Sequence, residues 1–224
     1  MSTAIDDLHI LPPCTEELKI LQRDADFLII NKPPRLLSVP GRHPQNHDSV
    51  ISRLLGEFPS AAIVHRLDFD TSGLMVIPLN KPALSHISKQ FQARTIRKTY
   101  TAVVAGLVAA DEGVIDLPIV ADMDNRPKYK ICHETGKPSV TEYTVVTRDT
   151  VACTSRLLLH PITGRSHQLR LHLQALGHPI LGCEFYADSV ALGQSARLLL
   201  HATQLSFYHP HTQTAQEYSC APDF

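Results

Sequence analysis

The chain has 224 residues, of which 43% are hydrophobic and 19% are charged, and this is the composition of a folded globular protein with one or two domains. No apolar run approaches the ~18–20 residues of a membrane-spanning helix, and residues 1–7 lack the pattern of a secretory signal. The formal net charge is −1, so binding to a polyanion would have to rest on local basic clusters. These features predict a cytoplasmic protein without membrane attachment.

The first predicted elements follow a leader with little periodicity, residues 1–18. The apolar, β-rich run 27–30 predicts a buried strand, and the Asn-Lys-Pro-Pro sequence at 31–34 predicts the turn that ends it. A short helix is expected after Asp48, which can cap it, and should stop near Pro59.

The middle of the chain alternates strand and helix patterns. Residues 73–79 predict a strand, and residues 82–95 predict an amphipathic helix with a proline as its first residue. Residues 99–105 predict another strand. Residues 140–147 and 155–160 predict the two strands of a hairpin.

The last predicted elements are one helix and two strands. The helix should span 166–176, with Ser166 as its cap and Gly177 behind it. The strands should span 198–207 and 214–219. The helices are too sparse for a regular βαβ series, so we expect a strand-rich α+β fold.

Cysteines and histidines give no pattern of a disulfide framework, a zinc site or a cofactor site. The number of cysteines is odd, no CxxC pair occurs, and none of the 13 histidines falls in a zinc-binding motif. No glycine-rich nucleotide fingerprint occurs either. We therefore expect reduced thiols and structural or RNA-contacting histidines. The cysteines are Cys14, Cys132, Cys153, Cys183 and Cys220.

A first polar cluster, residues 65–74, stands between an apolar segment and a predicted strand. Asp68 could serve there as a nucleophile or an acid–base group, and Arg66 could bind an anion. A turn in which Asp and Thr side chains bond local amides explains the same residues, so this cluster alone leaves both readings open.

A second cluster, residues 163–172, covers a loop-to-helix junction. Arg165, Ser166 and His167 there suit a phosphate. Arg170, one turn further on, could pair with a buried carboxylate and hold it ionised. The alternative is a solvated helix start.

Two further segments combine basic and aromatic side chains. In the first, Arg97 and Lys98 precede Tyr100, which could stack on a base or could simply be a half-buried strand residue. The second is the 126–130 segment, in which a tyrosine stands among basic residues, as suits single-stranded RNA or an ordinary solvated loop.

Taken together and in order, these clusters resemble the RluA-type pseudouridine synthases over roughly residues 20–224. The signature block is His65-Arg66-Leu67-Asp68-x-x-Thr71-Ser72-Gly73-Leu74. The other blocks that carry the resemblance are Asn31-Lys32-Pro33, Leu37-Ser38-Val39-Pro40-Gly41, Arg97-Lys98-x-Tyr100, Gly164-Arg165-Ser166-His167-Gln168-Leu169-Arg170-x-His172, Gly177-His178-Pro179-Ile180-Leu181-Gly182 and Leu199-Leu200-His201-Ala202.

The resemblance implies the pseudouridine synthase fold, with a mixed, mostly antiparallel central sheet flanked by helices and loops. It implies one catalytic domain over 19–224, preceded by the 1–18 leader and without an S4 domain. The implied reaction isomerises uridines in structured RNA and needs no cofactor or metal. The implied substrates are a large-subunit ribosomal RNA hairpin and a transfer RNA anticodon stem-loop. We expect a monomer.

By resemblance, Asp68 is the essential aspartate, Arg170 is the cation that holds it ionised, and Tyr100 stacks on the target base. The target uridine must be flipped out of its stack, and Arg66 is placed to fill the space or hold the phosphate. The remaining expected RNA contacts come from basic residues and histidines along the same blocks. They are Lys32, His65, Lys89, Arg94, Arg97, Lys98, Arg126, Lys128, Lys130, Arg165 and His167.

Two other function classes stay open at this point. One is a catalytically silent RNA-binding or ribosome-assembly protein on the same fold, although Asp68, Tyr100 and Arg170 are all present. The other is a nucleoside or glycoside hydrolase that pairs Asp68 with Asp70. One residue departs from the family pattern, because Cys183 stands where an aspartate is usual.

Overall fold

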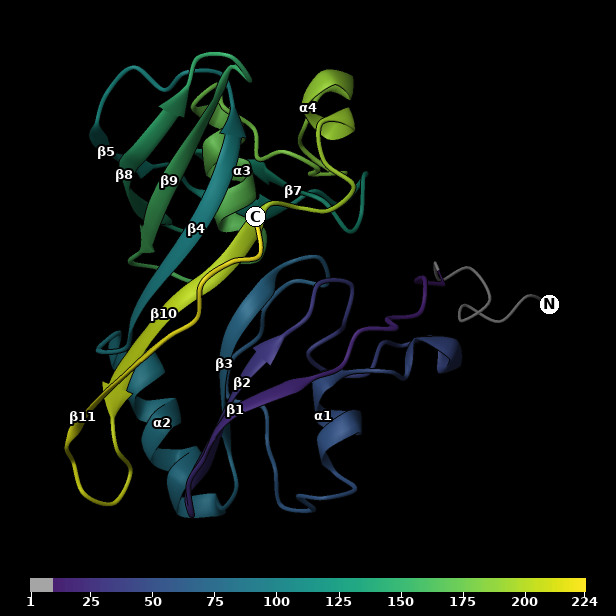
Figure 1. Ribbon diagram of the computed structural model, residues 1–224, viewed down its shortest axis with the longest axis vertical. Coiled ribbons are helices and arrows are strands. Elements are labelled where there is room, and N and C mark those ends of the chain that lie inside the picture. The colour runs from purple at the N-terminus through teal and green to yellow at the C-terminus, as the bar shows by residue number, and fades with distance from the viewer. Residues whose placement is uncertain (1–9) are drawn as a thin grey trace. The chain divides into compact units, whose positions relative to one another are not determined.

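The computed structural model describes residues 10–224, and they form two compact units (Figure 1). Unit 1 combines the described part of Met1–Ile96 with Gln204–Ala221, and unit 2 combines Arg97–Thr203 with Pro222–Phe224. Residues 1–9 of the predicted leader lie outside the described residues, and residues 10–18 contain no helix or strand. The single domain expected over 19–224 stays a prediction.

Unit 1 contains the strand order β1-β2-β3-β10, with β11 paired to β10, and the pairs β1–β2, β2–β3 and β10–β11 are antiparallel. Every residue of β3 is buried, as its apolar sequence predicts. The long helix of this unit, α2, contributes Ile87 to a core with strand residues such as Phe27 and Phe207. The elements are β1 (Lys19–Arg23), β2 (Phe27–Lys32), the 3-10 helix η1 (Pro44–Asn46), α1 (Val50–Leu54), β3 (Ser72–Pro78), α2 (Lys81–Ala93), β10 (Leu200–Tyr208) and β11 (Ala215–Ser219).

Unit 2 contains the strand order β10-β4-β9-β8-β5, and its described pairings are antiparallel. The strand β10 contributes its first residues, 200–203, to this unit. Helix α3 packs Leu169 and Leu173 against strand residues such as Leu157 of β9. The elements are β4 (Arg97–Ala105), β5 (Glu112–Asp116), β6 (Ile119–Ala121), β7 (Tyr129–Ile131), β8 (Val140–Asp149), β9 (Thr154–Pro161), α3 (Gln168–Ala175) and α4 (Ser189–Gly193).

This arrangement confirms the predicted strand-rich α+β class and the 140–160 hairpin, but two predicted helix caps are wrong. Ser49, not Asp48, caps α1 through a capping box with Ser52, while the Asp48 carboxylate pairs with Arg53. Ser166 does not cap α3. The cap residue is His167, which has a left-handed backbone (φ 56°) and makes no side-chain capping bond.

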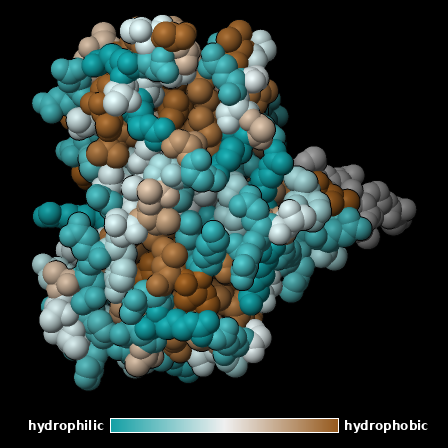
Figure 2. All heavy atoms as spheres, viewed as in Figure 1, coloured by the Kyte–Doolittle hydropathy of each residue, from teal (hydrophilic) through white to brown (hydrophobic). Residues whose placement is uncertain are grey.

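The surface drawn in Figure 2 is largely hydrophilic, with hydrophobic atoms grouped between the polar side chains. Exposed large hydrophobic residues occur in unit 2 at Val114 and Val151, among others. Across residues 10–224, no helix combines the length and the apolarity that crossing a membrane requires.

Candidate active site

Asp68 lies in the turn before β3, and buried side chains hold the backbone on both sides of it. On one side, the Ser38 hydroxyl donates to the Leu67 carbonyl (2.8 Å) and accepts the Leu67 N–H (3.1 Å). On the other side, the Lys32 ammonium donates to the Phe69 carbonyl (3.1 Å). The half-buried Asp68 side chain is thus carried by a turn whose two neighbouring residues are fixed.

Lys32 is completely buried, with 0% of its surface exposed. Besides Phe69, its Nζ atom donates to the carbonyls of Pro33 (2.9 Å) and Leu36 (2.7 Å). Three carbonyl partners satisfy the three donors of an ammonium. The prediction that Lys32 contacts RNA is therefore wrong, because the ammonium is inside unit 1 and binds its backbone.

Tyr100 lies in β4 of unit 2, opposite Leu159 of β9, where its half-buried ring packs against the unit's core. Its neighbour Thr99 is buried and bonds His160 through its hydroxyl (Oγ1 to Nδ1, 3.3 Å). The start of the strand is more open, since Arg97 is exposed and Lys98 is half-buried. The strand therefore holds the tyrosine in place while its first residue faces solvent.

Arg170 belongs to α3 and is 2% exposed. The start of this helix is fixed by Gln168, whose side-chain amide donates to the Val140 carbonyl (2.9 Å) and to the Thr141 hydroxyl (3.0 Å). The same side chain accepts the Thr163 hydroxyl through Oε1 (2.7 Å). Because β8 carries Val140 and Thr141, the sheet of unit 2 sets the position of Arg170.

Three side chains from the loop after α3 contact the Arg170 guanidinium. Its Nε donates to the Cys183 sulfur (3.3 Å). Its central carbon lies 5.0 Å from the ring centre of Phe185 and 5.5 Å from that of Tyr186, as in cation–π contacts. Sequence reasoning noted Cys183 as a departure but assigned no role to it, to Phe185 or to Tyr186.

Gly182 sets the course of this loop. Its φ is +69°, and a Cβ atom there would lie 2.0 Å from the Arg197 carbonyl oxygen. Only glycine combines this conformation with this close approach. The backbone can therefore deliver Cys183 to Arg170 only because position 182 has no side chain.

Comparison with known proteins decides the family. The family model of RNA pseudouridylate synthases matches residues 26–175. This chain belongs to the RNA pseudouridylate synthase family. It is thus an enzyme of the pseudouridine synthase class, an intramolecular isomerase, as the sequence motifs predicted.

Curated relatives of this synthase match it over nearly its whole length. It is 51% identical to the dual-specificity RNA pseudouridine synthase RluA of Yersinia pestis, over 92% of this chain and 99% of that protein. It is 47% identical to the protein of the same name from Escherichia coli strain K12, over 95% of this chain and 97% of that protein. The expected resemblance to RluA-type synthases is confirmed.

A solved structure confirms the fold of the synthase. The human RNA pseudouridylate synthase domain containing 1 superposes with a TM-score of 0.78, at 31% identity, over 95% of this chain and 86% of that one. The predicted pseudouridine synthase fold, a mostly antiparallel sheet with few helices, is therefore correct.

The other basic residues predicted to bind RNA are mostly on the surface of the synthase. Some already have partners, since Lys130 pairs with Asp122 (3.2 Å) and Arg165 Nε donates to the Pro138 carbonyl (3.4 Å). Lys128 and Arg165 are half-buried. The exposed residues of the set are Arg66, Lys89, Arg94, Arg97, Arg126 and Lys130. Their RNA contacts stay a prediction.

The two predicted RNA-binding histidines take part in packing within their units. The Val76 N–H donates to His65 Nε2 (3.1 Å), and the His65 ring stacks on Phe91 at 4.7 Å between centroids. His167 Nδ1 bonds the Tyr186 hydroxyl (2.7 Å). Both rings are half-buried and have structural partners, and their RNA contacts also stay a prediction.

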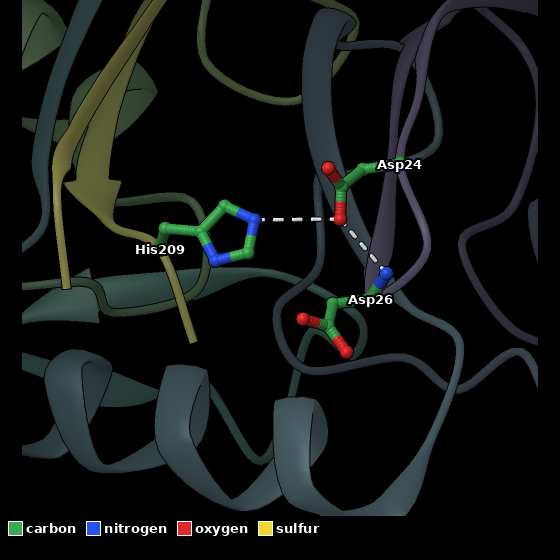
Figure 3. A group of neighbouring side chains, drawn as sticks. All are labelled: Asp24, Asp26 and His209. Atoms are coloured by element: carbon green, nitrogen blue, oxygen red, sulfur yellow. Dashed lines mark hydrogen bonds and ion pairs between the residues drawn. The ribbon is translucent and has the colours of Figure 1, made fainter. Parts of the chain in front are cut away.

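A cluster with metal-ligand chemistry lies apart from these residues, in unit 1. The ligand-type atoms of Asp24, Asp26 and His209 lie within 4.8 Å of one another (Figure 3). However, His209 Nδ1 accepts the N–H groups of His211 (3.0 Å) and Thr212 (3.3 Å), so the proton of the neutral ring is on Nε2. That Nε2–H faces Asp24 at 3.4 Å.

The carboxylates of this cluster also have partners within the fold. Asp24 accepts the Asp26 N–H (2.8 Å), and Asp26 accepts the Asn80 side-chain amide (2.8 Å). Because Asn80 caps α2, the cluster joins the β1–β2 turn, the start of that helix and the β10–β11 turn. Hydrogen bonds within unit 1 thus account for these three residues as fold-stabilising groups.

Proposed function

We propose that this synthase converts specific uridines to pseudouridine in two kinds of RNA, a large-subunit ribosomal RNA hairpin and a transfer RNA anticodon stem-loop. The observation that carries the proposal is the 47–51% identity, over nearly the full chain, to relatives named dual-specificity RNA pseudouridine synthases. The proposal places the enzyme in the cytoplasm, as a monomer, where both RNAs are met.

The reaction moves a bond without changing the oxidation state of the nucleoside. The bond from uracil N1 to ribose C1′ breaks, the base turns, and C5 bonds to C1′. The C5 hydrogen leaves as a proton, and N1 gains one. The protein must therefore hold the released base and move protons, and a fixed acid–base or nucleophilic group is the minimum requirement.

We assign that group to Asp68. Support comes from the turn that carries it, because Ser38 and Lys32 fix the residues on either side and reduce its freedom to misalign. A second support is the match of Asp68 to the motif aspartate of the family. Arg170 is assigned as the cation of the reaction, because it matches the arginine of the family motif at 164–172.

Tyr100 is assigned to the target base. An aromatic ring can stack on a flipped uracil, and β4 provides a rigid position for it. Flipping a base out of a hairpin costs a few kcal/mol, which the contacts to the rest of the RNA must offset. Arg66, exposed and two residues before Asp68, is assigned to the vacated space or to the flipped phosphate.

The proposal is tested by release of tritium from transcripts labelled at uridine C5. Wild type, Asp68→Asn and the matched neighbour Asp70→Asn are compared on an anticodon stem-loop and on a ribosomal hairpin. We expect release from both RNAs by wild type and by Asp70→Asn, and from neither by Asp68→Asn. Release from one RNA alone would overturn the dual specificity, and full activity of Asp68→Asn would overturn its assignment.

The same reaction mixtures separate the isomerase from a hydrolase. A hydrolase acting through Asp68 and Asp70 would release free uracil and would lose activity in both variants. The proposal requires that the base stays attached to the RNA, so nucleoside digestion should recover pseudouridine in an amount equal to the tritium released.

A further inference from the structure

The contacts around Arg170 extend to a second layer that no catalytic assignment includes. The Tyr186 ring lies beside the guanidinium, with 5.5 Å from its centre to the guanidinium carbon. The hydroxyl at the other end of that ring bonds His167 Nδ1 (2.7 Å) and accepts the backbone N–H of Tyr129 (2.9 Å). Tyr186 thus joins the arginine to two separate segments of unit 2, through the His167 side chain and the Tyr129 backbone.

Those two segments are fixed parts of unit 2. Tyr129 begins β7, which pairs with β6, and His167 is the residue from which α3 starts. Their rings also contact each other edge to face, with centroids 5.2 Å apart. The Tyr186 hydroxyl therefore fixes the direction of its ring against the first residue of β7 and the residue that precedes α3.

Three contacts to the guanidinium come from the loop after α3. The Cys183 sulfur accepts from Nε (3.3 Å), and the ring centres of Phe185 and Tyr186 lie 5.0 and 5.5 Å from the guanidinium carbon. A cation–π contact forms over the face of a ring, so the direction of the ring influences where the guanidinium lies. The orientation of Arg170 within unit 2 is therefore sensitive to how firmly the Tyr186 ring is held.

We propose that Tyr186 is a positioning residue for Arg170, acting through its hydroxyl bonds to His167 and to the Tyr129 backbone. The proposal rests on the assigned role of Arg170 in the reaction. Tyr186 does not touch the reacting atoms in this scheme. It holds the guanidinium in the direction that the reaction requires, so its loss reduces turnover and leaves RNA affinity intact.

The test compares Tyr186→Phe, which keeps the ring and removes only the hydroxyl, with wild type on a C5-tritiated transcript. We expect kcat to fall about 5- to 20-fold, because a small misplacement of a reacting group lowers the rate. The KM for RNA should stay within about twofold, since the transition state and not the bound RNA is affected. Tyr143→Phe removes a hydroxyl from a buried tyrosine of β8 in the same core and should keep wild-type kcat.

A double-mutant cycle with Arg170→Lys separates positioning from general stability. If Tyr186 acts through the guanidinium, Tyr186→Phe should change kcat by less than about twofold in the Arg170→Lys background. Phe185→Leu is an independent test, because it removes the other ring from the guanidinium. It too should change kcat by less than about twofold in the Arg170→Lys background. Melting temperatures of all variants identify any that are not folded at the assay temperature.

The outcomes distinguish this inference from the function on which it rests. Wild-type kcat in Arg170→Lys would refute the assigned role of Arg170 and the inference together. A loss in Arg170→Lys with wild-type kcat in Tyr186→Phe would overturn the inference alone. Losses that multiply in the double variant would also overturn it, because Tyr186 would then act independently of the arginine.

Discussion

The Ser38 hydroxyl binds both backbone groups of one residue, Leu67, by donating to its carbonyl and accepting its N–H. Both residues are buried, and Leu67 directly precedes Asp68. A side chain that substitutes for a strand partner in this way fixes the peptide planes on both sides of one Cα atom. The sequence block at 37–41, which contains Ser38, therefore supports the aspartate of the 65–74 block.

Replacing Ser38 by alanine should lower both stability and turnover. Two buried backbone groups lose their partner, so we expect a loss of about 1–3 kcal/mol in the free energy of unfolding. Ser155→Ala is a matched control, since Ser155 accepts the Val108 N–H (3.0 Å) and donates to the Gly106 carbonyl (2.9 Å) in unit 2. Urea unfolding and tritium release should show similar destabilisation in both, with a loss of kcat only in Ser38→Ala.

Replacing Lys32 by methionine should act on folding and not on RNA contacts. Three carbonyls lose an ammonium donor, and we expect a stability loss of at least about 2 kcal/mol. The slope of log K for RNA binding against log salt should be unchanged, because no phosphate contact is removed. Arg97→Ala, at an exposed basic position, should reduce that slope by about 1. A reduced slope in a folded Lys32→Met protein would restore Lys32 as an RNA contact.

Stability should fall as the pH drops below neutrality because of His172. Burial lowers the pKa of this imidazole, while its bond to the Leu117 carbonyl and the charge of Asp116 oppose the shift. Below about pH 6.5 the unfolded chain therefore binds a proton that the folded chain does not. The stability that follows from the lowered pKa of His172 is fully present above about pH 6.5 and is lost as the pH falls toward the pKa of the folded state.

Melting temperatures between pH 5.5 and 7.5 check this dependence. His172→Gln should flatten the decline at the acidic end, although it also costs stability at pH 7.5 because the ring bonds Thr141 and Leu117. His133→Gln, at an exposed position, should keep the wild-type pH dependence. An unchanged decline in His172→Gln would assign the effect to other groups.

Cys132 should be unusually reactive toward alkylation. The Thr135 hydroxyl, and then the backbone N–H groups of Thr135 and Glu134, lower the pKa of this thiol by stabilising the thiolate. Iodoacetamide at pH 7.5, followed by peptide mass spectrometry, should label Cys132 faster in wild type than in Thr135→Val. Equal labelling rates would show that the hydroxyl has no such effect.

The apolar strands and the long helix were predictable from sequence, and the reasons are local. β2 and β3 are nearly continuous buried runs, and α2 has an asparagine cap and an early proline. The strands that went unpredicted, such as β1 and β5, are mostly exposed and so lack a hydrophobic pattern. Their pairing depends on partners elsewhere in the chain.

The motif residues were also predictable, but their surroundings were not. Lys32 was expected to contact RNA because it is a basic residue in one of the family blocks, and only the fold shows that its ammonium donates to three carbonyls. The left-handed His167 and the ring of Tyr186 likewise depend on contacts between α3, β7 and the 182–186 loop. Long-range packing of this kind leaves no signal in spacing or composition.

Gly182 should tolerate few substitutions. It has no side chain to take part in the reaction, yet a Cβ atom there would lie 2.0 Å from the Arg197 carbonyl oxygen. A screen of random variants for RNA modification should therefore find position 182 almost as intolerant as Asp68. We thus expect a position without a side chain to be among the most sensitive of this synthase, because the Arg197 carbonyl lies where a side chain would begin.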